Sequence, residues 1–534
     1  MRSDPVPSPT PAISPKEWRN VALIWIGALL LWIPFYWHAR PIALQDPDAQ
    51  DYAQIARNVA EGKGFITSIM PLGGLEWMKQ TGRLGQPWWN LHRFPLPSLI
   101  QAGLMKVVGP RDFAISLSSA LFFFFAIPLV YLFARRMFSH RVALLSTFLF
   151  AFNGGQLGDS ITGLTEPAAL FFFLAALYLV LWPSRWWHIP LAGLITGLAF
   201  LNRYSVALYA LPMLILIWKT HRRRPLAAAL EFVVPAAAVA FPWLYRNYLL
   251  AGDPLFSLTT ALMVRYMTAA SPHTHDWYQF IYEKPAHFWM AHPGWTVKKW
   301  LIQTGDLWWN NIDSIGDLGK VFPFFVVSTL RPMVNEAQRL RRWLLGVFVL
   351  HFVTLGLLSN IPRYYAIFTP FLIIYAADAL LWIWDQVRPG LSPSRASFAV
   401  FVTVPLLFGS LYIIGPPRRP REDRTWVEWK LNNQRWIHTS TPKGAIILSD
   451  VPWSVAWYGY RRSLPLPPTP ADLPRFADYG VTPDGIYLKS PRKRMNVPDG
   501  WDEWRVVQFG RLPLPGYGPP HVFPDQSVYY ARLR

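Results

Sequence analysis

Three carboxylates and a tyrosine stand close together near the start of the chain. Asp46, Asp48 and Asp51 fall within six positions, and Tyr52 follows directly. In a helix, Asp48, Asp51 and Tyr52 would occupy neighbouring faces, because residues three and four apart are neighbours on the helix surface. A carboxylate in such a group can act as a general base that removes the proton from an acceptor hydroxyl.

Helix capping explains the same acids in another way. Asp46 can cap a helix, Pro47 suits its first position, and the helix dipole favours further acids in the first turn. A short helix at a membrane surface gains little from so many carboxylates, however. We therefore interpret Asp46 as the cap and Asp48 as the candidate base, while the role of Asp51 stays open.

Glu166 is a second candidate acid. It stands before Pro167 at the start of an apolar segment, 162–182, so it is expected at the outer end of a membrane span. An ionisable residue at membrane depth is a functional candidate by default. The helix dipole alone would also favour a carboxylate at a helix start, so a purely local role is the alternative.

Several cations stand where the positive-inside rule does not expect them. Arg203, Arg246 and Arg363 lie at predicted outer ends of spans, and His92 and Arg93 lie in the long loop before them. Guanidinium groups can hold a phosphate bidentately, although each arginine alone could also reach toward lipid headgroups. The pattern suits a site at the outer membrane surface, with acids for an acceptor hydroxyl and arginines for a lipid-linked phosphate leaving group.

The composition indicates what kind of protein carries these residues. Of 534 residues, 52% are hydrophobic and only 15% are charged, which is typical of a polytopic membrane protein. The net charge of +20 needs no nucleic acid partner, because cytoplasmic loops collect Lys and Arg. The chain has no cysteine, which excludes disulfides and Cys-ligated zinc. It also lacks a Gly-rich phosphate loop, an HExxH zinc motif and a serine nucleophile elbow.

The apolar runs predict an all-α polytopic membrane protein with about eleven transmembrane helices. The first span, 21–37, is expected to stay uncleaved. The other spans are expected at 113–134, 141–155, 162–182, 189–202, 204–218, 226–245, 319–331, 343–359, 364–384 and 396–414. A first long loop, 40–112, should carry helices on the membrane surface near 48–61 and 95–108, and a second long loop covers 246–318.

Three parts are expected along the chain. They are a disordered N-terminal tail at 1–15, a transmembrane domain at 16–415 and a small α/β domain at 416–534. Strands are predicted at 445–448, 485–488 and 528–531, with helices near 425–438 and 471–479. A cytoplasmic N-terminus places most loop Lys and Arg inside, and both long loops and the C-terminal domain outside. A multi-pass membrane protein is therefore expected, and its Arg- and Pro-rich composition without cysteine indicates a prokaryotic plasma membrane.

In order along residues 20–385, these motifs resemble the GT-C superfamily of integral-membrane glycosyltransferases. The resemblance is closest to the branch of protein O-mannosyltransferases and aminoarabinose transferases of lipid A. The matching motifs are Asp48-x-x-x-Tyr52, Glu61-Gly-Lys-Gly-Phe65, His92-x-x-Pro95-Leu96-Pro97, Thr165-Glu166-Pro167, Leu201-x-Arg203, Pro242-Trp243-x-x-Arg246-Asn247 and Arg363-Tyr364. Their order carries the resemblance more than any single motif.

The resemblance implies an inverting glycosyltransferase that moves a sugar from a polyprenyl-phosphate carrier to a hydroxyl of a protein, lipid or glycan on the outer face. By position, it implies that Asp48 is the base and Glu166 a second acid near the acceptor or a metal, with Asp51 as a further catalytic candidate. The implied substrate-binding residues are Tyr52, His92, Arg93, Arg203, Arg246, Arg363 and Tyr364. Several relatives carry an Asp-Glu pair where Ala49 follows Asp48 here, so a divalent metal at Asp48 and Glu166 stays an open question.

A polytopic transporter or flippase for a lipid-linked or anionic substrate is the main alternative. It would require two related halves and charges near the middle of the membrane. The sequence shows no paired halves, and its acids gather toward one surface. A non-catalytic scaffold built around the C-terminal domain is a third possibility, but it gives the acids and arginines no role.

Overall fold

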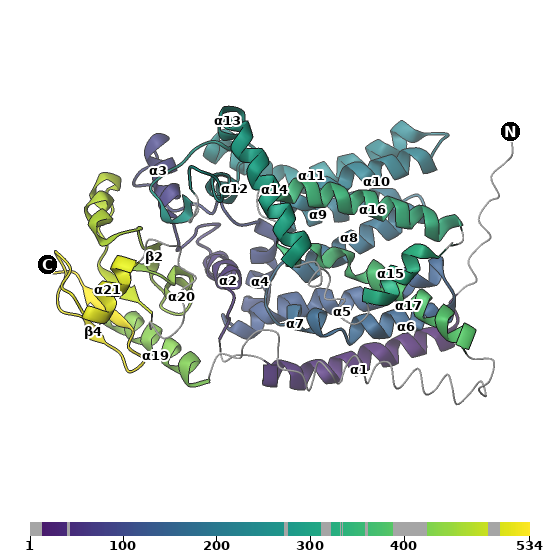
Figure 1. Ribbon diagram of the computed structural model, residues 1–534, viewed down its shortest axis with the longest axis horizontal. Helices are drawn as coiled ribbons and strands as arrows, with labels where there is room; N and C mark the ends of the chain where they lie inside the picture. The colour runs from purple at the N-terminus through teal and green to yellow at the C-terminus, as the bar shows by residue number, and fades with distance from the viewer. Residues whose placement is uncertain are drawn as a thin grey trace.

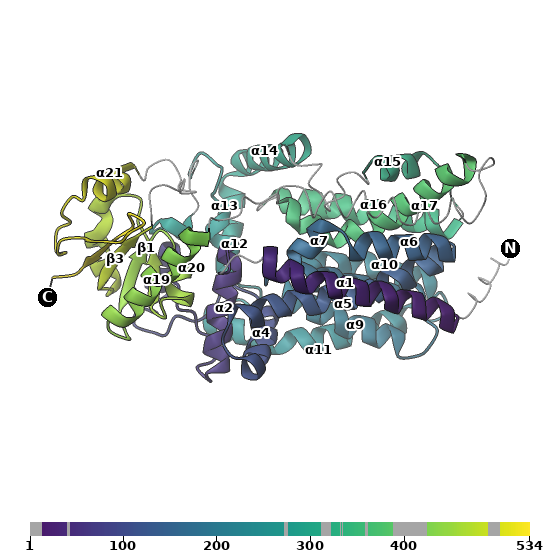
Figure 2. The same ribbon diagram turned by 90° about the horizontal axis from the view of Figure 1, so that it is seen from below.

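The computed structural model divides into three parts (Figures 1 and 2). A bundle of long helices fills one end, a small sheet with its own helices fills the other, and short helices from the two long loops lie between them. The described residues are 13–39, 43–271, 276–310, 322–331, 333, 335–357, 361–387, 424–489 and 502–533.

Among the described residues, four helices are long and apolar enough to cross a bilayer. They cover Pro15–Trp37, Asp112–Met137, Pro225–Ala251 and Pro362–Gln386. Shorter apolar helices accompany them at His140–Ala151, Glu166–Leu181, His188–Asn202 and Tyr204–Thr220. The chain is thus a mostly helical membrane protein. The total of eleven spans stays a prediction, and the span expected at 396–414 lies outside the described residues.

The helices of the bundle begin and end close to the predicted apolar runs. They are α1 (Pro15–Ala39), α5 (Asp112–Met137), α6 (His140–Ala151), α7 (Gly154–Asp159), α8 (Glu166–Leu181), α9 (His188–Asn202), α10 (Ala207–Thr220), α11 (Pro225–Ala251), α15 (Phe322–Leu330), α16 (Asn335–Gly356) and α17 (Thr369–Val387). The 3-10 turns η1 (Tyr204–Val206) and η5 (Pro362–Phe368) precede α10 and α17. Large buried side chains such as Phe123, Phe133 and Phe173 fill the space between them.

Two glycines allow α9 and α11 to approach closely. A Cβ on Gly193 would overlap the carbonyl oxygen of Phe232, and one on Gly197 would lie 2.7 Å from the carbonyl oxygen of Ala236. Small residues four positions apart let the backbones of membrane helices touch. This contact fixes the end of α9, where Arg203 follows the last helical residue.

The two long loops form short helices. The first loop contains α2 (Pro47–Ala60), α3 (Leu72–Gln80) and α4 (Pro95–Val108), and the second contains α12 (Leu258–Met263), η2 (Asp276–Tyr278), α13 (Pro285–Ala291) and α14 (Pro293–Asn310). Asp46 caps α2 as predicted, because its carboxylate accepts a hydrogen bond of 2.9 Å from the backbone nitrogen of Asp48. That α2 lies at the membrane surface stays a prediction, while the structure shows that every residue from 49 to 58 is covered by other parts of the protein.

A five-stranded mixed sheet forms the C-terminal part. Its elements are α19 (Arg424–Ser440), β1 (Ile446–Ser449), α20 (Pro452–Trp457), β2 (Arg462–Pro465), η7 (Pro470–Tyr479), β3 (Gly485–Leu488), α21 (Asp502–Gly510), β4 (His521–Val522) and β5 (Val528–Ala531). The strand order is β2-β1-β3-β5-β4. β1 runs parallel to β2 and β3, and β5 runs antiparallel to β3 and β4. The predicted strands are β1, β3 and β5, whereas β2 and β4 were not predicted.

The C-terminal part packs directly on α2. The buried Arg57 of α2 donates hydrogen bonds of 2.7 and 2.6 Å to the carbonyl oxygens of Trp457 and Ala456, at the end of α20. Its guanidinium carbon also lies 3.9 Å from the ring centre of Tyr460. The first loop pairs with the sheet as well, because Ile69 forms a parallel bridge to Ser463 of β2. This packing explains why α2 is buried.

Candidate active site

Asp48 lies between two arginines from distant parts of the chain. Its Oδ1 accepts a hydrogen bond of 2.7 Å from Nη2 of Arg93, and its Oδ2 accepts one from Nη2 of Arg363. The Asp48 side chain is 27% exposed, against 17% for Asp46, 4% for Glu166 and none for Asp51. Asp48 is therefore the carboxylate in this cluster that a substrate reaches most easily.

Asp51 lies behind Asp48 and is fully buried. Its Oδ2 accepts hydrogen bonds of 2.7 Å from Nε of Arg93 and 3.0 Å from Nε2 of His92, and its Oδ1 accepts one of 2.9 Å from Gln54. Asp48 and Asp51 thus meet the same guanidinium group, as their helical spacing predicts. Asp51 thus holds Arg93 and His92 in position. The sequence alone left the role of Asp51 open.

Glu166 adds a third carboxylate from the first residue of α8. Its Oε1 lies 3.4 Å from both Nη atoms of Arg203 and 3.5 Å from Nε of Arg363. Its Oε2 is buried and makes no hydrogen bond. Arg363 therefore joins Glu166 to Asp48, and the starts of α2 and α8, the end of α9 and the turn η5 meet at one place.

Two of the arginines lie against the rings of tyrosines. The guanidinium carbon of Arg203 lies 4.0 Å from the ring centre of Tyr364, and that of Arg93 lies 5.4 Å from the ring centre of Tyr52. Such contacts with the face of a ring stabilise a cation. Both tyrosines are thus part of the cluster that the sequence predicts.

The two arginines keep Asp48 ionised. Burial alone would raise the pKa of Asp48, but the guanidinium groups of Arg93 and Arg363 outweigh burial and hold this pKa well below its ordinary value. Asp51 behaves similarly: burial opposes ionisation, yet His92 and Arg93 lower its pKa to about 2. For Asp46, burial and the nearby Asp48 carboxylate raise the pKa. While its arginines remain in place, Asp48 is a weak base.

Asp46 has a second role that the sequence did not reveal. Besides capping α2, its Oδ2 lies 3.3 Å from Nη1 of Arg363. The two residues are separated by 317 positions, so no local pattern could have paired them. Arg363 therefore contacts the carboxylates of Asp46, Asp48 and Glu166, which makes it the central cation of the cluster.

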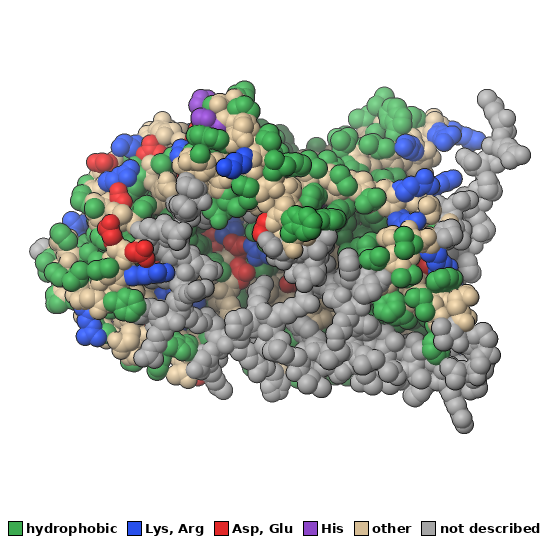
Figure 3. Space-filling view, in the orientation of Figure 1, with side chains coloured by type: hydrophobic (Ala, Val, Ile, Leu, Met, Phe, Trp, Pro, Cys, Tyr) green, Lys and Arg blue, Asp and Glu red, His purple; other side chains and the backbone are tan. Residues whose placement is uncertain are grey.

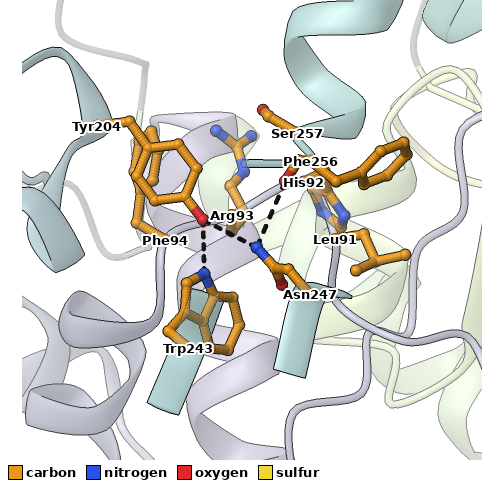
Figure 4. Close-up of a pocket in the computed structure, with 9 residues that line it drawn as sticks. All are labelled: Leu91, His92, Arg93, Phe94, Tyr204, Trp243, Asn247, Phe256 and Ser257. Atoms are coloured by element: carbon orange, nitrogen blue, oxygen red, sulfur yellow. Dashed lines mark hydrogen bonds between the residues drawn. The ribbon is translucent and has the colours of Figure 1, made fainter. Parts of the chain in front are cut away.

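Arg246, the third predicted phosphate ligand, lies elsewhere. Its guanidinium donates hydrogen bonds of 3.1 and 3.2 Å to the carbonyl oxygens of Asn90 and Phe65, so it ties α11 to the first loop. Its neighbour Trp243 lines a narrow recess together with Arg93 and Tyr204 (Figure 4). There the hydroxyl oxygen of Tyr204 accepts hydrogen bonds from Trp243 at 2.5 Å and from Asn247 at 3.3 Å. Arg246 and the residues that line this recess hold the loop that carries His92 and Arg93 in place.

A divalent metal does not fit the predicted pair of ligands as they are arranged. Each oxygen of Asp48 already faces a guanidinium group, and Oε1 of Glu166 faces two. Within the described ranges, no group of three or more His, Asp or Glu side chains could hold a metal ion.

The surface of the molecule shows how a substrate could approach. In Figure 3, acidic and basic side chains lie side by side in a hollow near the middle of this face, in the region where α2 lies in Figure 1. In the same view the C-terminal part lies to the left of these side chains and the bundle lies to their right. The site therefore lies between the two parts.

One family model matches part of the chain. The model of the dolichyl-phosphate-mannose-protein mannosyltransferases matches residues 92–246. This segment contains His92, Arg93, Glu166, Arg203 and Arg246. No curated protein sequence matches the chain.

Solved structures match nearly the whole chain at low identity. An oligosaccharyltransferase of Archaeoglobus fulgidus, in complex with Zn and sulfate, has a TM-score of 0.58 at 14% identity, over 96% of this chain and 73% of its own. AglB of the same organism, in complex with an inhibitory peptide and a dolichol-phosphate, has a TM-score of 0.59 at 12% identity, over 97% of this chain and 74% of its own. ArnT of Cupriavidus metallidurans, bound to undecaprenyl phosphate, has a TM-score of 0.57 at 13% identity, over 97% of this chain and 99% of its own.

At these identities the solved structures show a shared fold. The likeness to ArnT extends over nearly the full length of both chains. The family match thus covers residues 92–246, and the fold shared with ArnT and with the archaeal oligosaccharyltransferases covers nearly the whole chain.

Proposed function

We propose that the protein is an inverting glycosyltransferase that takes a sugar from a polyprenyl-phosphate carrier and transfers it to a hydroxyl acceptor at the outer face of the membrane. The observation that carries this proposal is the position of Asp48. It is the most exposed carboxylate of its cluster, and two guanidinium groups that suit a phosphate hold it. AglB and ArnT, which share the fold, have been solved with dolichol-phosphate and undecaprenyl phosphate, and this supports the choice of carrier.

The arginines give donor binding a way to activate the base. A donor phosphate would compete with Asp48 for Arg93 and Arg363. Each contact that the phosphate takes over removes a cation from Asp48, so the pKa of this carboxylate rises and it becomes a stronger base. Asp48 would then become a competent base only when a donor is bound.

The transfer step follows from this arrangement. Asp48 accepts the proton of the acceptor hydroxyl while the hydroxyl oxygen forms a bond to the anomeric carbon. The bond between this carbon and the phosphate oxygen breaks, and its electron pair stays on the phosphate. Arg93 and Arg363 stabilise the negative charge that develops there. A single displacement of this kind inverts the configuration of the anomeric carbon.

The other residues of the cluster keep these groups in place. Asp51 holds Arg93 and His92, and Glu166 holds Arg203 and Arg363. Buried acids in these positions orient the arginines without reaching the substrate themselves. We assign Asp51 and Glu166 as positioning residues in this proposal, and Arg203 as a further phosphate ligand.

The distribution of charge favours transfer over transport. A transporter or flippase is expected to carry charged groups near the middle of the membrane, between two related halves. The acids and arginines described above instead come from the ends of α8 and α9, from η5 and from the first long loop. They form a site at one end of the bundle.

A transfer assay tests the proposal. The full-length protein in lipid nanodiscs is offered a panel of polyprenyl-phosphate sugars and acceptors, and product is measured for the wild type, Asp48→Asn and Asp385→Asn. Loss of the base is expected to lower the rate by about 100-fold or more. Asp385, an exposed partner of Arg141 outside the cluster, serves as a control that should leave the rate unchanged. Full activity in a folded Asp48→Asn protein would contradict the assignment of the base.

A further inference from the structure

A buried histidine lies behind the arginine cluster and has no part in the proposed chemistry. His351 of α16 is 1% exposed, and so is Tyr209 of α10. The rings of Tyr365 and Phe368 surround His351, with centres 5.0 and 5.9 Å from that of the imidazole. A polar ring in so apolar a place must form its hydrogen bonds within the protein.

Both nitrogens of His351 have a partner, and the partners determine which nitrogen carries the proton. Nε2 lies 3.2 Å from the carbonyl oxygen of Tyr364, which can only accept, so Nε2 donates. Nδ1 lies 2.6 Å from the hydroxyl of Tyr209, which donates to it. Tyr209 therefore fixes the tautomer in which His351 can hold the backbone of Tyr364.

The residue held in this way supports the cations of the site. Tyr364 directly follows Arg363 in η5, and its ring centre lies 5.6 Å from the guanidinium carbon of Arg363 and 4.0 Å from that of Arg203. The Tyr364 ring contacts both guanidinium groups, so a shift of the Tyr364 backbone would displace this ring from them. The hydrogen bond from His351 holds the η5 backbone from inside the bundle, next to Arg363, and so restricts how Arg363 can move.

We propose that His351 is a positioning residue for phosphate binding, which acts through the backbone carbonyl of Tyr364 on Arg363 and Arg203. This inference rests on the proposed function, because it assumes that these arginines receive the phosphate of a polyprenyl carrier. Tyr209 is the second member of the device, since it keeps the imidazole in the donating tautomer. A site whose ligands are fixed before binding loses less free energy when the phosphate arrives.

Binding of undecaprenyl phosphate to the full-length protein in nanodiscs tests the inference without knowledge of the sugar. His351→Leu removes the donated hydrogen bond and is expected to weaken binding about tenfold, or about 1.4 kcal/mol. His351→Gln can still donate to the Tyr364 carbonyl and should restore the affinity to within about threefold of the wild type. His188→Leu removes another buried histidine, the first residue of α9, whose ring contacts the carbonyl oxygen of Trp182. This variant should leave the affinity unchanged.

Other results would overturn the inference. Unchanged affinity in His351→Leu would show that Tyr364 does not need this bond, and equal losses in the Leu and Gln variants would assign the effect to packing of the ring. If His351→Leu does not fold, Tyr209→Phe removes only one hydroxyl and is expected to weaken binding about threefold. Unchanged affinity there would contradict the role of the tautomer. A wild-type protein that does not bind undecaprenyl phosphate would instead overturn the proposed function itself.

Discussion

At the scale of single residues, the site is a row in which basic side chains and carboxylates alternate. His92, Asp51, Arg93, Asp48 and Arg363 follow one another through direct contacts. The sequence indicated most of these residues, because acids near a predicted outer surface and arginines at outward helix ends are both unusual. It could not indicate how they pair, since the pairing depends on where distant helix ends meet.

The buried pair of Asp51 and Arg93 is expected to stabilise the fold. Replacing Asp51 with Asn leaves a buried guanidinium partly uncompensated, and the free energy of unfolding should fall by about 3 kcal/mol. Thermal unfolding of the purified protein at pH 7 measures this change. Asp385→Asn, which breaks an exposed pair, should change stability by less than about 1 kcal/mol.

The same pair predicts how stability depends on pH. The pKa of Asp51 is about 2 in the folded protein, below the ordinary value of about 3.9. Its contribution is therefore fully present above about pH 4 and is lost as the pH falls toward 2. Asp51→Asn should show a smaller loss of stability than the wild type between these pH values, and parallel curves for the two proteins would contradict the assignment.

At the scale of elements, helix starts were the most predictable feature. Asp46-Pro47 and Pro95 mark the starts of α2 and α4, because proline and a capping carboxylate suit the first turn. The burial of α2 was not predictable. It depends on Arg57 meeting Trp457, 400 positions later, and no periodicity within α2 contains that information. The strand β2 was missed because it is short and includes Arg462 and Pro465.

The contact between α9 and α11 makes a prediction at this scale. Gly197→Ala places a methyl group 2.7 Å from the Ala236 carbonyl oxygen and should destabilise the protein by about 1–3 kcal/mol. Gly103→Ala, in α4, meets nothing within 4 Å and should be neutral or slightly stabilising, because alanine favours a helix. Melting temperatures of the two variants compare these effects. Equal shifts would show that the helices can separate at no cost.

At the scale of the whole molecule, the account depends on the side of the membrane that each part faces. The charge of the loops predicts a cytoplasmic N-terminus, with both long loops and the C-terminal part outside. The structure brings those loops and the C-terminal sheet together around α2, as a common location requires. The orientation itself remains a proposal.

The absence of cysteine makes this orientation easy to measure. Lys63→Cys introduces an exposed thiol in the first long loop, and Arg223→Cys introduces one between α10 and α11. A membrane-impermeant maleimide should label the first variant in intact cells and the second only after the membrane is opened. Labelling in the reverse order would place the site on the cytoplasmic side, and the unmodified protein provides a background without thiols.

The central claim is that Asp48 is the base and that it competes with the donor phosphate for Arg93 and Arg363. The most direct test measures affinity for undecaprenyl phosphate and the rate of sugar transfer in the same Asp48→Asn preparation. The account predicts that transfer falls by about 100-fold or more while undecaprenyl phosphate binds at least as tightly as to the wild type, because a competing anion has been removed. Undiminished transfer, or a parallel loss of binding and transfer, would contradict it.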